Sequence, residues 1–216
     1  MEALKRSLSS LKETEISQRI EEFKTLGEKG RVRFNFRRLL GIEYEADLFS
    51  ELCFCILTAG FSASRAVKIQ SQIGIEGFLY LSEAELRERL KSLGYRFPNR
   101  ASRILKAREK AQDIFRLVSS NKHSKEVREE LYRRDSKLKV EGFGIKEASH
   151  FLRNTGRLDI AIVDRHIMRF LKSIGLEPKN YFLAESALQD IAKNLRLSLG
   201  ELDLVIFYLM TGAVVK

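Results

Sequence analysis

The sequence predicts an all-α protein of two helical lobes, and three observations support that prediction. Apolar residues recur at helical spacing along most of the 216-residue chain. Only two prolines occur, so long helices are permitted almost everywhere. The polar stretch 119–125 interrupts the periodicity, and we interpret it as a linker between the lobes. We assign residues 1–30 and 125–216 to one lobe and residues 42–122 to the other.

The first part of the chain contains two predicted helices separated by an ambiguous stretch. An apolar stripe from Ile16 to Phe23 predicts the first helix, which ends at Gly30. Residues 31–40 alternate in part between polar and apolar, which is compatible with a short strand or with an extended connector. A strongly apolar helix follows and ends at Gly60.

Helix start and stop signals mark the rest of the chain. Ser82 and Glu85 form an S-x-x-E capping box, and Gly94 ends the helix that follows. Pro98 opens a longer helix whose apolar face extends to Val118. Two further apolar stripes predict helices near the end of the chain: Leu188, Ile191, Ala192 and Leu195, then Leu202, Val205, Ile206 and Leu209.

The charge of the chain points to a polyanionic partner. Lysine and arginine number 39 against 29 acidic residues, giving a net charge of +10 and a pI near 9.7. Nucleic acid is the first candidate for such a partner, and the alternative is a basic surface that serves only solubility.

The cysteines and the chain start indicate a cytoplasmic protein without a metal centre. Cys53 and Cys55 lie in one apolar run, where they are poorly placed to bridge, so we expect buried thiols in a reducing compartment. No Cys/His spacing suggests zinc, and the four thiolates of an iron–sulfur cluster are lacking from the sequence. The opening MEALKRSLSS has no apolar core of a signal peptide, and no apolar run is long enough for a membrane span.

The most informative stretch is LKVEGFGIKEASHFLRNTGRLDIAIVDRHIMRF. Gly142 and Gly144 permit a tight turn between two helical segments, and its backbone N–H groups suit a phosphate. A plain inter-helix turn is the alternative. Lys146 opens the next helix, and the positive end of a helix disfavours the ammonium form of a lysine. Lys146 could therefore be a nucleophilic amine. The alternative is a lysine that binds phosphate. Asp164 follows 18 positions later as a helix N-cap, a role compatible with a place at a cleft.

This pattern resembles the helix–hairpin–helix DNA glycosylase superfamily. A G-x-G hairpin, a lysine two residues on and V-D-x-H at this distance carry the resemblance from about Asp47 to the end of the chain. KEASHFLRNTG, Gly212 and a final Lys216 are similar to the compact 8-oxoguanine glycosylases of archaea and some bacteria. The resemblance implies a DNA-binding cleft between the two lobes. One departure is Glu141, where the superfamily often has proline, and we expect it to loosen the turn.

The resemblance implies a bifunctional glycosylase and AP lyase acting on double-stranded DNA that contains 8-oxoguanine. Lys146 would attack C1′ and form a Schiff base, and Asp164 would stabilise positive charge at the sugar. β-Elimination would then nick the strand. This chemistry needs no metal or organic cofactor, although a monovalent cation at the hairpin is compatible with it. We expect a monomer associated with the nucleoid.

Five residues are candidates for binding the flipped base. Phe207 matches an aromatic that stacks on the base in relatives, with a plain core residue as the alternative. Asp203 lies one turn earlier and could accept from the N1–H and N2–H₂ donors of guanine. Lys216 could complete the pocket with its α-carboxylate or its side chain, so added residues should selectively harm excision of 8-oxoguanine. Phe97 is a candidate second stacking wall, and His150 could line the pocket, although an interior histidine is the favoured interpretation.

A second set of residues is predicted to contact DNA outside the base pocket. Phe61 stands in a loop that fills the gap left by the flipped base in relatives, and we expect it to act as an apolar wedge. The other candidates are the hairpin glycines and basic or imidazole side chains: Gly142, Gly144, Arg65, Arg96, Arg100 and His166. His123, in the linker, is expected on the surface.

Two other functions remain open at this stage. One is a related glycosylase for another damaged base, and the other is a helix–hairpin–helix module that binds DNA without catalysis. Lys146 with Asp164 argues against the module, because clamping a DNA backbone requires neither residue at that spacing. Asp203, Phe207 and Lys216 favour a purine with the donors of guanine.

Overall fold

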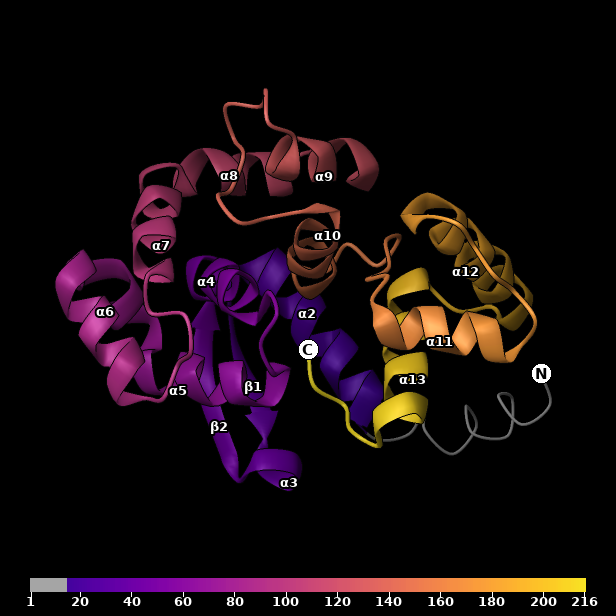
Figure 1. Cartoon of the computed structure of the whole chain (residues 1–216), viewed down its shortest axis with the longest axis horizontal. Coiled ribbons are helices and arrows are strands. Elements are labelled where there is room, and N and C mark those ends of the chain that lie inside the picture. The colour runs from indigo at the N-terminus through magenta and orange to yellow at the C-terminus, as the bar shows by residue number, and fades with distance from the viewer. Residues whose placement is uncertain (1–14) are drawn as a thin grey trace.

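The computed structural model describes residues 15–216 and is mostly helical, as predicted (Figure 1). The helices are α2 (Glu15–Lys29), α3 (Arg37–Leu40), α4 (Leu48–Thr58), α5 (Ala63–Tyr80), α6 (Glu83–Ser92), α7 (Arg100–Glu109), α8 (Ala111–Val118), α9 (Ser124–Tyr132), α10 (Ile145–Asn154), α11 (Arg165–Ser173), α12 (Tyr181–Leu195) and α13 (Leu199–Thr211). The opening segment for which no signal peptide was predicted lies outside the described residues. Within residues 15–216, no helix is long and apolar enough to cross a membrane.

A two-stranded antiparallel sheet resolves the ambiguous stretch as a strand and adds a second strand that the sequence analysis did not predict. Strand β1 (Arg31–Phe36) pairs with β2 (Ile42–Asp47), and Phe34 lies opposite Tyr44. Alternate residues of β1 are buried, so its apolar side faces the core. The turn of α3 and Gly41, with a φ of 71°, joins the strands.

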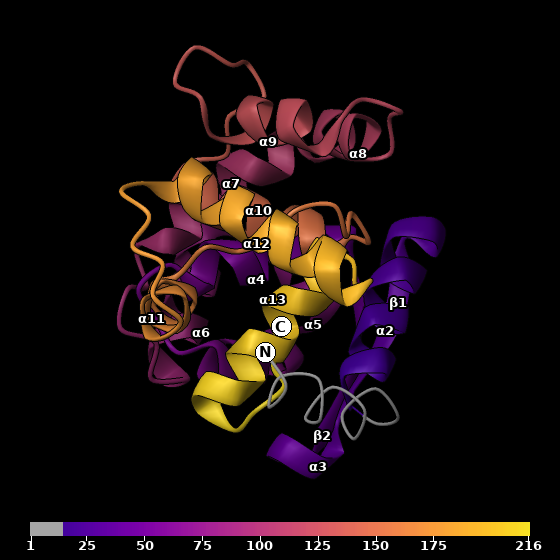
Figure 2. The same cartoon turned by 90° about the vertical axis from the view of Figure 1, so that its right-hand side faces the viewer.

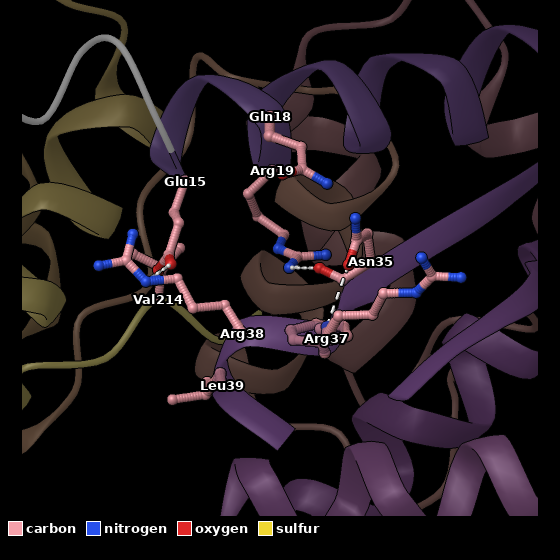
Figure 3. A pocket seen from close by; sticks show the side chains of 9 residues that line it. Glu15, Gln18, Arg19, Asn35, Arg37, Arg38, Leu39 and Val214 are labelled. Carbon is pink, nitrogen blue, oxygen red and sulfur yellow. Dashed lines mark hydrogen bonds and ion pairs between the residues drawn. The ribbon is translucent and has the colours of Figure 1, made fainter. Parts of the chain in front are cut away.

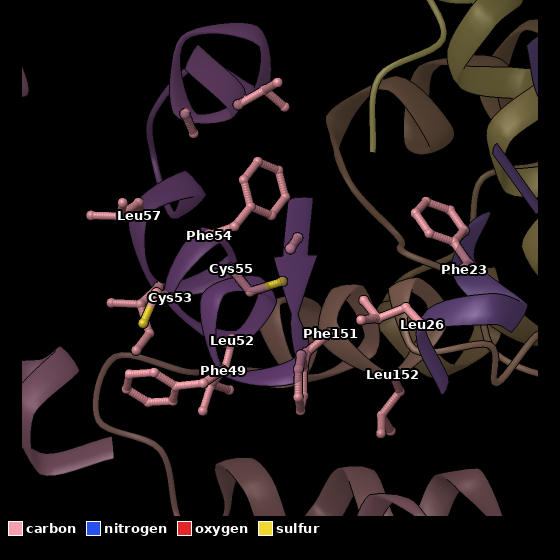
Figure 4. Packing of buried hydrophobic residues seen from close by; sticks show 14 of the residues in the cluster. Phe23, Leu26, Phe49, Leu52, Cys53, Phe54, Cys55, Leu57, Phe151 and Leu152 are labelled. Carbon is pink, nitrogen blue, oxygen red and sulfur yellow. The ribbon is translucent and has the colours of Figure 1, made fainter. Parts of the chain in front are cut away.

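The main core surrounds α4, which is buried along nearly its whole length. Helices α5, α7 and α10 and strand β2 all pack against it. Figure 4 shows apolar side chains of α4 beside Phe151 of α10, with Phe23 of α2 further along the same cluster. Gly27 allows the backbones of α2 and α10 to approach, because a Cβ atom there would lie 2.2 Å from the Thr155 carbonyl oxygen. This packing fixes the position of α10, the helix that carries Lys146.

The two cysteines of α4 lie in this core as free thiols. Cys53 and Cys55 are both fully buried. Burial in apolar surroundings raises the pKa of each thiol well above its ordinary value. Both therefore remain uncharged, in agreement with the predicted buried thiols.

A second apolar cluster is formed by α11, α12 and α13. It includes Ile167, Leu188 and Leu202. In Figure 1 these helices lie on the opposite side of α10 from α5 and α6, and Figure 2 shows α12 crossing over α13. The arrangement is compatible with two lobes, but the assignment of residues 42–122 to a separate lobe remains a prediction.

Two predicted elements differ in their limits. The long helix predicted from Pro98 to Val118 is broken at Lys110, where φ is −105° and ψ is 2°. The predicted linker is shorter than expected because α9 already begins at Ser124. Arg157 holds this connection by donating hydrogen bonds to the carbonyl oxygens of Val118, Ser120 and Lys122.

Candidate active site

The hairpin between α9 and α10 has the predicted tight turn. Gly142 has a φ of 87°, a conformation that L side chains rarely adopt. Phe143 between the two glycines is buried and packs near Phe151, with the ring centroids 6.5 Å apart. Glu147 accepts a hydrogen bond from the Gly144 N–H (3.2 Å) and so caps the start of α10. The hairpin is therefore anchored by one apolar side chain and one carboxylate.

Helix α7 supports the hairpin from the outside. A Cβ atom added to Gly142 would lie 2.5 Å from Nη1 of Arg103, so this guanidinium rests against the turn. Lys106 Nζ lies 2.7 Å from Glu141 Oε1. Glu141, which stands where the superfamily often has proline, thus ties the turn to α7 through an exposed ion pair.

Lys146 is the second residue of α10, as predicted. Its side chain is 37% exposed and its Nζ lies 3.2 Å from Glu147 Oε1. The same glutamate therefore contacts both the Gly144 amide and the lysine through its two oxygens. The amino group of Lys146 therefore stands at the first turn of a helix, on a partly exposed side chain, beside one carboxylate.

Asp164 is the N-cap of α11, in agreement with its local sequence. Its Oδ1 accepts hydrogen bonds from the N–H groups of His166 (2.8 Å) and Ile167 (3.0 Å). Both bonds use the same oxygen, and the residue is only partly buried, so the second carboxylate oxygen is available for another contact. A cap role and a role at a cleft are therefore compatible.

The extended segment before Asp164 is held by side chains from α12 and α13. Tyr181 of α12 is hydrogen-bonded to the Ala161 carbonyl (2.8 Å) and to the Val163 N–H (3.2 Å). Asp203 of α13 accepts a hydrogen bond from the Ile162 N–H (3.0 Å). Asp164 thus follows three consecutive residues whose main-chain groups are tied to other helices.

Asp203, predicted to bind the base, also has a structural role through its contact with Ile162. The residue is buried, and Oδ2 lies 3.8 Å from Nη1 of Arg153. Burial, partly opposed by Arg153 and the Ile162 amide, raises the pKa of Asp203 to about 6. Oδ2 already accepts a hydrogen bond from the protein, so Oδ1 is the oxygen with more acceptor capacity left for a ligand. Reading two guanine donors with both oxygens, as the sequence analysis predicted, would require the Ile162 contact to be shared.

Phe207 lies beside the start of α11. Its ring is half-buried and makes an edge-to-face contact with His166, with centroids 5.4 Å apart. His166 is two residues after Asp164, so the predicted stacking residue and the predicted catalytic carboxylate belong to one neighbourhood. The ring is neither fully buried nor fully exposed.

The side chain of Lys216 is buried in the core beside α4. Its Nζ lies 2.6 Å from Glu51 Oε2 and 2.7 Å from Gln70 Oε1. It also lies 4.1 Å from the ring centroids of Phe34 and Phe54. Burial lowers the pKa of Lys216 to about 8, although the Glu51 carboxylate opposes the shift. These contacts turn the ammonium group toward the core. A contact of Lys216 with the base, through its side chain or its α-carboxylate, stays a prediction.

His150 joins this region to α10. It is buried, its ring contacts Phe54 edge-on at 5.5 Å, and it shares a hydrogen bond with the backbone of Lys216. Burial, followed by the charges of Arg153, Lys146 and Lys216, lowers the pKa of His150 well below its ordinary value, so the imidazole is neutral. Its buried Nε2 has no hydrogen-bond partner among the described residues. The favoured interpretation of an interior histidine agrees with its burial.

Arg100, a predicted DNA contact, is partly buried and is hydrogen-bonded within the protein. Its guanidinium donates hydrogen bonds to the carbonyl oxygens of Ile56, Leu57 and Ala59 and to the Tyr95 hydroxyl. The last carbonyls of a helix lack partners within the helix, and Arg100 satisfies those of α4. Sequence position cannot distinguish an arginine used in this way from one that faces DNA.

The other predicted DNA contacts lie nearer the surface. Arg65 and Arg96 are exposed. Phe61 is only partly exposed, and its ring packs edge-on against Tyr95 at 4.8 Å. Phe97 is also half-buried, with the Arg100 guanidinium 4.7 Å from its ring centroid. The two phenylalanines therefore flank one tyrosine on the α4–α7 side of the molecule.

A pocket of about 330 Å³ lies elsewhere, between α2 and the β1–α3 turn (Figure 3). Three arginines line it, and each is matched by a carboxylate: Arg19 with Glu22, Arg37 with Glu43, and Arg38 with Glu15. Residues other than the predicted site residues form its wall. The paired charges leave this pocket without a surplus of either sign.

Comparison with known proteins places this arrangement in a family. A model of the family described as 8-oxoguanine DNA glycosylase matches residues 16–197. The chain belongs to that family. The 8-oxoguanine DNA glycosylase/AP lyase of Aquifex aeolicus is 51% identical over 209 residues, which cover 93% of this chain and 92% of that protein.

Two solved structures of 8-oxoguanine glycosylases share the fold. The Thermotoga maritima 8-oxoguanine DNA glycosylase superposes with a TM-score of 0.82 at 38% identity, covering 100% of this chain and 97% of that one. The Methanocaldococcus jannaschii 8-oxoguanine glycosylase/lyase, in complex with a 15mer DNA containing 8-oxoguanine, gives 0.79 at 40% identity and covers both chains fully. The helix–hairpin–helix glycosylase fold that the sequence analysis predicted is thereby confirmed.

Several residues that organise this glycosylase site were missed from the sequence. Glu51 carries a signal, because it is the one acidic residue inside the buried helix sequence LFSELCFCILT. Gln70 and Tyr181 carry none, since a polar residue at such positions is ordinary on a helix. Arg103 was overlooked among the many arginines of a basic chain.

Proposed function

We propose that this chain excises 8-oxoguanine from double-stranded DNA and then cleaves the strand at the resulting abasic site. The observation that carries the proposal is that Lys146 stands at the start of the hairpin helix and Asp164 caps the next helix, in a chain of this family. The name of the Aquifex aeolicus relative, 8-oxoguanine DNA glycosylase/AP lyase, supports both activities.

Lys146 would act as the nucleophile once its amine is neutral. Attack of Nζ on C1′ forms a C–N bond while the glycosidic bond breaks, and the base leaves with the bonding electrons and takes up a proton. Loss of a proton from nitrogen and opening of the sugar ring give a Schiff base. Removal of a C2′ proton then expels the 3′ phosphate and nicks the strand. Asp164 would stabilise positive charge at the sugar during these steps.

The flipped base would lie between the aromatic side chains on the two sides of α10. Phe207 would stack on one face and Phe97 on the other. Asp203 would accept a hydrogen bond from the Watson–Crick edge of guanine through Oδ1. We propose that the Lys216 side chain, anchored on Glu51, fixes the backbone beside His150 and acts on the lesion only indirectly.

The DNA backbone would be bound at the hairpin and by exposed cations. Amides near Gly142 and Gly144 suit a phosphate, and a monovalent cation at the hairpin is compatible with that contact. Arg65 and Arg96 are exposed and would add charge contacts. Phe61 would fill the gap left by the base, with His166 near a phosphate. We expect a monomer that acts on the nucleoid in the cytoplasm and needs no metal or organic cofactor for the reaction.

Borohydride trapping tests the proposal. Duplex DNA with a single 8-oxoguanine is incubated with the wild-type chain, Lys146→Gln and Asp164→Asn in the presence of sodium borohydride. The wild type should form a covalent adduct that Lys146→Gln does not form. The absence of both adduct and strand cleavage would refute the proposal. The same assay with other damaged bases then separates a different glycosylase from a module that only binds DNA.

A further inference from the structure

We propose that Tyr181 is a positioning residue whose hydroxyl sets the place of Asp164 relative to Lys146. The inference rests on the proposed roles of those two residues. Tyr181 touches neither Lys146 nor Asp164 directly. It acts through the backbone before Asp164 and through α10, the helix that carries Lys146.

The hydroxyl of Tyr181 contacts both elements of the site at once. On one side it is hydrogen-bonded to the Val163 N–H (3.2 Å) and the Ala161 carbonyl (2.8 Å), immediately before Asp164. On the other side it lies 2.9 Å from Oγ of Ser149. Ser149 is one helical turn after Lys146, so a single oxygen atom joins the two chain segments.

The hydrogen bonds of this hydroxyl have a defined direction. A tyrosine hydroxyl has one proton to donate and can accept two hydrogen bonds. The Ala161 carbonyl can only accept, so it takes the one tyrosine proton. Ser149 Oγ, which accepts from Arg128 Nη1 (3.1 Å), therefore donates its own proton to Tyr181. The Val163 N–H fills the second acceptor position. Burial raises the pKa of Tyr181 to about 12, so the tyrosine proton stays in place at neutral pH.

A buried ion pair fixes Tyr181 from behind. Arg128 of α9 and Glu185 of α12 form a bidentate pair with distances of 2.6 and 3.0 Å, and both are almost completely buried. Glu185 lies one turn after Tyr181, and the Arg128 guanidinium is 5.5 Å from the tyrosine ring centroid. The ring and the hydroxyl are therefore held by separate contacts on three helices.

The segment 160–163 depends on such contacts because it belongs to no helix or strand. If the hydrogen bonds to Tyr181 are removed, the contact between the Ile162 N–H and the Asp203 side chain is the one hydrogen bond that still holds this segment among the described residues. A displacement of reacting groups by about 1 Å can lower a rate about 100-fold. Loss of the hydroxyl should therefore reduce the rate of base excision while leaving the DNA-binding surface intact.

The test compares Tyr181→Phe with the wild type in single-turnover excision of 8-oxoguanine, borohydride trapping, DNA affinity and thermal unfolding. Ser124→Ala is the control, because it removes another buried hydroxyl whose partners, Asp159 (2.6 Å) and Arg157 (3.2 Å), lie outside residues 160–163 and outside α10. We expect Tyr181→Phe to slow excision and trapping roughly 10- to 100-fold, with affinity for lesion DNA unchanged. Ser124→Ala should keep the wild-type rate.

A double-mutant cycle separates positioning from general stability. If Tyr181 acts through Asp164, Tyr181→Phe should slow the residual reaction of Asp164→Asn by no more than about twofold. Ser149→Ala, which removes only the contact with α10, should give a smaller loss in the same direction. Equal rate losses in both backgrounds, or equal losses for Tyr181→Phe and Ser124→Ala, would overturn the inference. Failure of the wild type to form an adduct would instead refute the proposed function, and the inference with it.

Discussion

The buried contact between Lys216 and Glu51 gives a prediction that can be worked through quantitatively. Lys216→Met keeps an unbranched side chain of similar length and removes the ammonium group. Nζ lies 2.6 Å from Glu51 Oε2, and both side chains are fully buried. The substitution therefore leaves a carboxylate in the core without its cation.

The expected loss follows from that unpaired charge. Removing one partner of a buried pair costs roughly 3–5 kcal/mol. In a chain of this size each kcal/mol lowers Tm by about 2–4 °C, so the expected fall is about 6–20 °C. Glu51 still accepts hydrogen bonds from Asn154 Nδ2 (2.6 Å) and Gln70 Nε2 (3.2 Å), which places the expected value in the lower half of that range.

Thermal unfolding of Lys216→Met, Glu51→Gln and the double variant would measure the coupling. The double variant should unfold at a higher temperature than Lys216→Met, because a neutral amide then replaces the Glu51 carboxylate and no unpaired charge stays in the core. A change in Tm below about 2 °C for Lys216→Met would refute the reasoning. Additive losses in the double variant would refute it as well.

Four further predictions concern the site. Asp164→Asn should keep the helix cap, because asparagine caps as well as aspartate; circular dichroism melting should show little change while excision falls at least 100-fold, and an active variant would contradict the assigned role. Arg100→Ala should lower Tm by several degrees, since the carbonyls at the end of α4 lose their donor. Arg65→Ala and Arg96→Ala should instead weaken DNA binding and each reduce the salt dependence by about one unit, measured by fluorescence anisotropy. The pKa of Asp203, raised to about 6, means that the folded state holds this proton more tightly than the unfolded state; its stabilising effect is present at acid pH and lost as pH rises through 6. A protonated Asp203 has no negative charge and accepts hydrogen bonds from guanine less well, so the rate of excision should decline as pH falls through 6. The pH profile of Asp203→Asn should lack this decline.

Local signals in the sequence were sufficient for most helix starts and for the positions of the two proposed catalytic residues. Lys146 and Asp164 were placed at helix starts by glycines and a capping pattern, and the structure has them there. These signals act over a few residues, so one sequence contains them. The capping box at Ser82 and Glu85 was predicted and is present for the same reason.

The supporting contacts could not be predicted because they join distant parts of the chain. Glu51 and Lys216 are 165 positions apart, and Arg128 and Glu185 are 57 apart. No periodicity relates such residues. The second strand, β2, was missed because its burial pattern is irregular, whereas β1, of the same length, alternates between exposed and buried residues. The contacts of Arg100 with carbonyl oxygens at the end of α4 were not predicted, because a positive charge alone does not show which acceptor it meets.

The burial of Cys53 and Cys55 should protect this protein from oxidation of its thiols. Oxidants such as peroxide react with the thiolate form of cysteine, and a thiol held uncharged in a closed interior reacts slowly. 8-Oxoguanine accumulates under the same oxidising conditions that inactivate proteins with exposed thiolates. The protein should therefore retain its fold through an oxidative burst without a reductant to restore its cysteines, at the time when its substrate is most abundant.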